Sequence, residues 1–210
     1  MSPSAEIVVL LGGRLAVDFA NAPSYPGAPF NDLSWEELVG FLEAARIVSS
    51  ERSDQLLDLP ESDPRAAHAL LTRATHLRDA LREIFSAIVR HDLISPASTK
   101  PINDILRITE GHDELTEADG RWKLLFVARE TGLDWLLAAI ARSAAEIVLE
   151  GDAAKVRVCA NPACGLFFCS LSIRDSSKVV KYERTPFTGG LSAMGLVVSR
   201  TTFPSSPLPH

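Results

Sequence analysis

The longest regular pattern in the chain is a helical repeat of apolar residues between Pro64 and about Arg90. Asp63 is a suitable N-cap, and Pro64 suits the first helical position because its missing N–H needs no partner there. Apolar residues then recur at the spacing of one helix face, at Leu70, Leu77, Leu81, Ile84 and Ile88. We therefore expect a long amphipathic helix in a mainly helical body.

Other segments predict further helices. Ser34, followed three residues later by Glu37, forms a capping box and begins a helix that runs to about Val48. Three more helices are predicted, at residues 53–59, 101–108 and 133–149. Tryptophan occurs in apolar patterns at Trp35, Trp122 and Trp135, and we expect all three indole rings in the core.

Three stretches predict β-structure. Apolar runs on both sides of Gly12-Gly13 predict a β-hairpin over residues 6–19, because its second arm alternates in the manner of a half-buried strand. Turn-like residues followed by strand-like ones predict a second hairpin within residues 112–130. Residues 156–169 have the pattern of a strand, a tight turn and a strand.

Composition places the chain among globular proteins. Apolar residues make up 46% of the 210 residues and charged residues 23%, which is ordinary for a soluble domain. No apolar run approaches the roughly 18 residues of a membrane-spanning helix. The first apolar stretch has no basic region before it, so we expect no secretory signal and a cytoplasmic protein. Three cysteines are too few for a disulfide scaffold.

Charge is distributed unevenly along the chain. Residues 155–210 hold seven basic and two acidic side chains, whereas residues 1–154 hold 14 basic and 25 acidic ones. An acidic body with a basic tail suits a tail that contacts a polyanion such as DNA. The candidate DNA contacts are Arg174, Lys178, Lys181 and Arg184.

The strongest chemical motif is a cysteine pair. Cys159 and Cys164 flank a turn that contains Asn161-Pro162, and Gly165 follows. A turn between two short strands brings two thiolates to one side, as in the knuckle of a zinc ribbon. Zinc takes four ligands at tetrahedral angles, so this knuckle is a half-site for zinc. The alternative is that the cysteines are small buried apolar residues.

Few other residues could complete that site. Cys169 is a possible third ligand, five residues further on, and no cysteine follows it. Four histidines belong to the body and the fifth is terminal, namely His68, His76, His91, His112 and His210. We therefore expect at most about one zinc ion per two chains, because each chain supplies two of four ligands.

Two parts of the chain resemble a known family. Residues 156–168 resemble the opening of the CGNR zinc finger, in which a Cys-Ala-Asn-Pro-x-Cys-Gly knuckle precedes aromatic residues. Residues 12–21 and 77–85 resemble the ABATE domain of stress-induced transcription regulators, which is usually joined to that finger. The resemblance covers roughly residues 6–170 and implies DNA binding through a C-terminal zinc finger.

The sequence departs from that family after Ser170. The family finger continues with a basic segment, a Trp-Cys pair and a Cys-Gly-Asn-Arg string, and this chain has none of them. The expected fold is α+β: a mainly helical domain with two β-hairpins over 1–152, a truncated zinc-ribbon-like segment over 153–170, and an irregular tail over 171–210. We expect the core to be complete before residue 153.

Other polar groups suggest weaker sites. Arg14, Asp18 and Asn21 could line a pocket for a small ligand, and an exposed strand face beside an Asn turn is the alternative. Arg78 and Arg82, beside acidic neighbours, are typical of a solvated helix face. No catalytic sequence pattern is present, so we expect no enzyme.

Two classes of function stay open. One is a bacterial-type transcription regulator, whose body senses a signal or dimerises and whose finger places basic residues on DNA phosphates. The other is a ligand-sensing or protein-interaction module without DNA binding. The expected partners are weakly bound DNA, a second copy of the chain and a small-molecule effector, with no membrane.

Overall fold

The computed structural model describes residues 10, 12–22, 32–118, 121–129, 132–161, 164–170 and 195–197. That part of the chain is mainly helical, with two small antiparallel sheets. The helices are α1 (Leu15–Asn21), α2 (Trp35–Ala44), α3 (Ser50–Leu57), α4 (Leu59–Ser62), α5 (Pro64–Arg90), α6 (Pro96–Ile108), α7 (Trp135–Glu150) and the 3₁₀ helix η1 (Gly151–Ala154). The strands are β1 (Gly111–Ala118), β2 (Arg121–Ala128), β3 (Val156–Val158), β4 (Phe167–Cys169) and β5 (Gly195–Val197).

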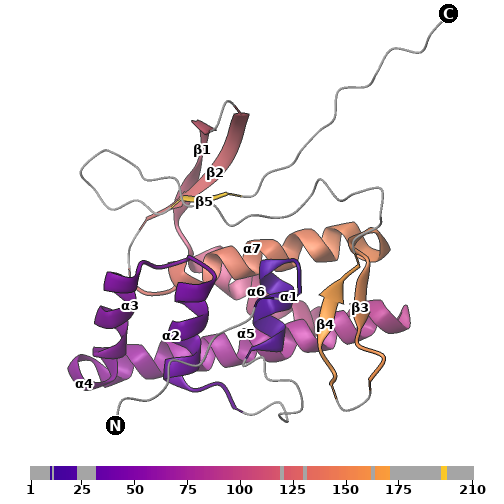
Figure 1. Ribbon diagram of the computed structural model, residues 1–210, viewed down its shortest axis with the longest axis horizontal. Helices are drawn as coiled ribbons and strands as arrows, with labels where there is room; N and C mark the ends of the chain where they lie inside the picture. The colour runs from indigo at the N-terminus through magenta and orange to yellow at the C-terminus, as the bar shows by residue number, and fades with distance from the viewer. Residues whose placement is uncertain are drawn as a thin grey trace, which may run out of the picture.

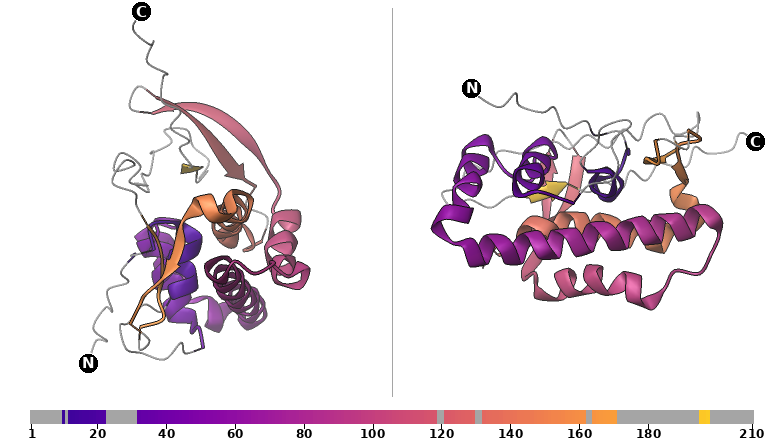
Figure 2. Two further views of the ribbon diagram at one scale, coloured as in Figure 1. Left: turned by 90° about the vertical axis from the view of Figure 1, so that its right-hand side faces the viewer. Right: turned by 90° about the horizontal axis from the view of Figure 1, so that it is seen from below.

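The long helix α5 organises the helical body. It runs the length of that body, with α6 on one side and α1 and α2 on the other (Figure 2). Its predicted start is confirmed, because the Asp63 side chain accepts a hydrogen bond from the Ala66 N–H. Its apolar face is fully buried at Leu70, Leu77, Leu81 and Ile84. The helices thus form one core along α5.

Helix α6 begins earlier than the sequence predicted. We expected Pro101 to start it, but Pro96 takes the first helical position and Ser95 caps it by accepting from the Ala97 N–H. Ser95-Pro96 is the same combination of cap and proline that begins α5. Pro101 lies inside the helix. The capping box of α2, between Ser34 and Glu37, is confirmed.

The hairpin predicted over residues 6–19 is wrong for the residues that the structure describes. Leu15–Asn21 form the helix α1, every residue of which is buried. A buried helix shows apolar residues on all sides, so the alternation of large and small residues resembled a strand. The chain turns into α1 at Gly13, whose φ of +76° suits glycine.

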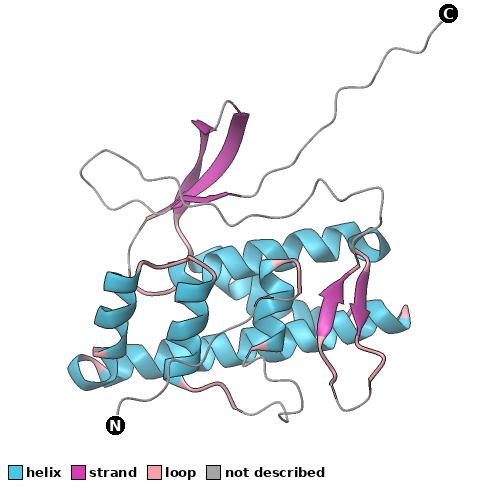
Figure 3. Ribbon diagram, in the orientation of Figure 1, coloured by secondary structure: helices cyan, strands magenta, loops and turns pink. Residues whose placement is uncertain are grey.

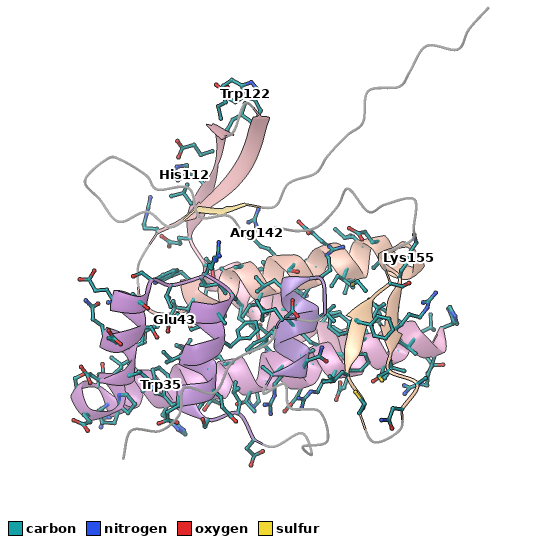
Figure 4. The ribbon with its side chains drawn as sticks, in the orientation of Figure 1. Trp35, Glu43, His112, Trp122, Arg142 and Lys155 are labelled. Atoms are coloured by element: carbon teal, nitrogen blue, oxygen red, sulfur yellow. The ribbon has the colours of Figure 1, made fainter. Side chains whose placement is uncertain are left out.

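The hairpin predicted within residues 112–130 is confirmed. β1 and β2 pair antiparallel from Gly111 with Ala128 to Ala118 with Arg121. Together they project from the helical body (Figures 1 and 3). Trp122 lies near the tip (Figure 4) and is 67% exposed, so the prediction that it is a core residue is wrong. Trp35 and Trp135 are buried as expected.

The C-terminal tail contains a strand that the sequence did not predict. β5 pairs antiparallel with β2, so residues 195–197 are not irregular. The remainder of the predicted tail, residues 171–194 and 198–210, lies outside the described residues. No helix in the described part of the chain has the length and apolarity needed to cross a membrane.

The strand–turn–strand pattern predicted at 156–169 is confirmed, since β3 and β4 pair antiparallel. Val156 and Phe167 from this hairpin are buried in the same core as the helices. The Phe167 ring meets the Phe85 ring of α5 edge-on, with centroids 5.7 Å apart. The core therefore extends past residue 152, although the domain boundaries at 152 and 170 stay predictions.

Candidate functional site

The cysteine knuckle is the loop between β3 and β4. The Cys159 N–H donates to the Leu166 carbonyl over 2.8 Å, which continues the strand pairing by one step. The Cys164 N–H donates to the Asn161 carbonyl over 2.9 Å and closes a tight turn. Gly165 follows with a φ of +63°, a left-handed conformation that favours glycine. The sequence Asn161 to Gly165 thus folds the loop back between two cysteines.

The two thiols of the loop are of the type and number that make one half of a zinc site. Both Cys159 and Cys164 are free thiols of intermediate exposure. Cys159 pairs with Leu166 at the base of the loop, and Cys164 closes the turn from Asn161, so both cysteines lie in the same short loop. No cluster of three or more His, Cys, Asp or Glu side chains suited to a metal occurs in the described parts of the chain. Zinc binding itself stays a prediction.

Cys169 lies at the opposite end of the hairpin from that loop. It pairs with Val156, and its N–H donates to the Gly12 carbonyl over 2.8 Å. The side chain packs against the core, and burial raises the pKa of its thiol to about 11. The structure therefore does not bring Cys169 beside the other two cysteines.

Asn21 joins the end of α1 to β4. Its side-chain Nδ2 donates to the Phe167 carbonyl over 2.7 Å, and its Oδ1 accepts from the Phe167 N–H over 2.9 Å. The side chain thus pairs with β4 much as another strand would, and it is buried. Because Phe167 follows the knuckle directly, Asn21 helps to determine where the knuckle lies on the body.

The other two residues of the predicted ligand pocket also bond within the protein. Asp18 accepts from the Gly12 N–H through its side chain over 2.6 Å. Arg14 reaches α7, where its guanidinium lies 3.2 Å from the Glu146 carboxylate and 2.9 Å from that of Glu150. Asp18 thus holds the turn before α1, and Arg14 links that turn to α7. Ligand binding by Arg14, Asp18 and Asn21 stays a prediction.

Two arginines of α5 donate hydrogen bonds to carbonyl groups at the C-terminal end of α1. Arg78 is buried and Arg82 is partly buried, so the prediction of a solvated helix face is wrong. Arg82 donates to the Ala20 carbonyl over 2.7 Å, and Arg78 donates to the Ala22 carbonyl over 3.2 Å. Burial, and then the charge of Arg78, lower the pKa of Arg82 to about 10. Both satisfy carbonyls that a helix end leaves without partners.

The residues predicted to contact DNA lie outside the described part of the chain, at Arg174, Lys178, Lys181 and Arg184. The structure describes the point from which that segment leaves the body. The Ser170 N–H donates to the Lys155 carbonyl over 3.0 Å, so the chain is paired up to the last residue before it. Arg157 on β3 is exposed nearby.

Comparison with protein families identifies the class. Residues 13–151, about two thirds of the chain, match the ABATE family, which is described as a "putative stress-induced transcription regulator". The chain belongs to the ABATE family. The match begins at the turn into α1 and ends after α7, before the cysteine knuckle. No curated protein matches the chain.

Proposed function

We propose that this ABATE protein takes part in transcription regulation by contacting DNA with the basic segment that follows β4. The observation that carries the proposal is the anchoring of β4. Asn21 and Gly12 hold Phe167 and Cys169 against α1, and the chain continues directly into residues 171–184. The segment that carries these basic side chains therefore starts from a defined point on an acidic body.

The expected mode of contact is electrostatic. Lys and Arg side chains that neutralise DNA phosphates give affinity without reading the base sequence. The knuckle offers two of the four ligands of a zinc finger, so we expect no complete finger that would enter a groove from a single chain. We expect weak binding that is lost between about 50 and 200 mM salt.

Fluorescence anisotropy of a labelled random duplex, measured with the full chain, tests this proposal. Binding is expected at about 50 mM salt and should be lost when four tail residues are changed to Gln: Arg174, Lys178, Lys181 and Arg184. The matched control changes four exposed body residues to Gln: Arg65, Arg90, Lys100 and Arg107. Equal losses in both variants, or no binding at about 50 mM salt, would refute the proposal. Sequence-specific binding at about 200 mM salt would refute the weak, electrostatic mode.

A second function is supported by one observation, the incomplete donor set at the knuckle. With two cysteines there and no third metal ligand among the described residues beside them, the chain could be an ABATE module that senses a ligand or binds a protein. This alternative predicts no DNA binding at about 50 mM salt, with or without added zinc.

A further inference from the structure

The knuckle brings two cysteines into one short loop, which is half of the ligand set of a zinc site. A structural zinc site takes four ligands in a closed tetrahedron. The chain has three cysteines, and the third is held at the far end of the hairpin by β4 and Gly12. The described residues place no His, Asp or Glu cluster at the pair. With the ligands that the described residues supply, a site made by one chain would be open on one side.

The face of the hairpin that carries Cys159 points away from the body. Val156 on β3 and Phe167 on β4 face the core. The next residue on each strand, Arg157 and Phe168, is exposed. Alternation along a strand puts Cys159 on the same face as Arg157, and its pairing with Leu166 is consistent with this placement. A second molecule could approach this face without disturbing the core.

We propose that two copies of this chain share one zinc ion, held by Cys159 and Cys164 from each copy. Four thiolates then close the site. The two copies are related by a two-fold axis, so the same surface of each chain forms the contact. Each of the four thiols loses its proton to solvent as its sulfur binds zinc. The inference goes beyond the proposed function and does not depend on DNA binding.

Charge and apolar surface around the knuckle favour this arrangement. Four thiolates around Zn²⁺ carry a net charge of about −2, since each thiolate contributes one negative charge. Arg157 is exposed on the same face of the hairpin, so the two copies bring two guanidinium groups to that anionic centre. Phe168, 39% exposed, lies beside Arg157 on that face and would be covered by the partner.

The test measures zinc content and molar mass of the full chain without a histidine tag, prepared with zinc and over a range of dilutions. We expect about one zinc ion per two chains, found with the dimer, and dissociation to zinc-free monomers when a chelator is added. Cobalt in place of zinc should give the absorption spectrum of a tetrathiolate site. One metal ion per monomer, or a dimer that survives complete removal of zinc, would overturn the proposal.

Cysteine variants locate the ligands. Cys159→Ser and Cys164→Ser should each lose both zinc and the dimer, whereas Cys169→Ala is the matched control and should keep both. Loss of zinc in Cys169→Ala with circular dichroism unchanged would instead indicate a three-thiolate site within one chain.

Alkylation of the unmodified protein gives the same information without any substitution. With zinc present, Cys159 and Cys164 should react with iodoacetamide at least tenfold more slowly than they do in the chelated protein. Mass spectrometry of the alkylated peptides measures the two rates. Protection of neither cysteine in the presence of zinc would contradict the shared site, whatever the variants do.

Discussion

The two hairpins of the molecule differ in what holds them. β1 and β2 are eight residues long, pair along their full length and project from the helices, with Leu115 and Trp122 more than 60% exposed. β3 and β4 are three residues long, and they are held by Val156 and Phe167 in the core and by Asn21. Strands of three residues are too short to pair stably alone. The body therefore determines where β3 and β4 lie, and with them the knuckle.

The largest expected effect comes from removing the short hairpin. A chain of residues 1–152 loses the burial of Val156 and Phe167, worth about 1.5–3 kcal/mol each, and Asn21 loses its two hydrogen bonds to Phe167 at about 1–3 kcal/mol. The combined loss, on the order of 5 kcal/mol, approaches the total stability of many domains. Urea unfolding should show a cooperative transition for residues 1–170 and a strongly weakened one for 1–152. Equal midpoints would show that the hairpin is not part of the core.

The next effect concerns the link between α1 and β4. Asn21→Ala removes both partners of the Phe167 backbone, so we expect a loss of about 3 kcal/mol in the free energy of unfolding. The matched control is Asn103→Ala on the exposed face of α6, expected to change stability by less than about 0.5 kcal/mol. Similar losses in the two variants would mean that the link to Phe167 adds little.

The same contrast explains which parts of the fold the sequence could predict. α5 and the β1–β2 hairpin were predicted because their signals are local: Asp63-Pro64 at the helix start and a turn between Ala118 and Arg121. α1 was predicted as a strand because its helical state depends on distant groups. Ser143 accepts from the Ala16 N–H, and α5 supplies the donors at the other end.

The loop of the candidate site was predictable, but its anchoring on the body was not. The spacing of Cys159 and Cys164 around Asn161-Pro162 identified the loop, and the structure forms that loop. The role of Asn21 as a partner of Phe167, 146 residues away, has no signal in the local pattern. Likewise, the neighbouring acids of Arg78 made it resemble a solvated residue, although it caps a buried helix.

A smaller effect is expected at the turn where α1 and β4 meet. A Cβ at Gly12 would lie 2.6 Å from Cγ1 of Val17 and 2.9 Å from the backbone nitrogen of Asp18. Gly12→Ala should therefore cost about 1–3 kcal/mol through overpacking. Thermal unfolding of the variant and of the unchanged chain measures this loss of stability. An unchanged melting temperature would show that the backbone of this turn can shift to accept the added Cβ.

The smallest effects are expected in the projecting hairpin. Leu115→Thr and Trp122→Thr replace exposed apolar side chains with a residue that favours strands, so each should change stability by less than about 0.5 kcal/mol. Urea unfolding of both variants checks this. A loss of 2 kcal/mol or more in either would mean that this face is buried in the folded protein, and the contrast between the hairpins would fail.

Native-state hydrogen exchange tests most directly whether the knuckle hairpin belongs to the ABATE body. The N–H of Phe167 donates to Asn21 and that of Cys169 donates to Gly12, so both amides should exchange only when the whole domain unfolds. Amides of β1 and β2 should exchange through local opening, at a lower free energy. Exchange at Phe167 and Cys169 as fast as in β1 and β2, or faster, would contradict the account.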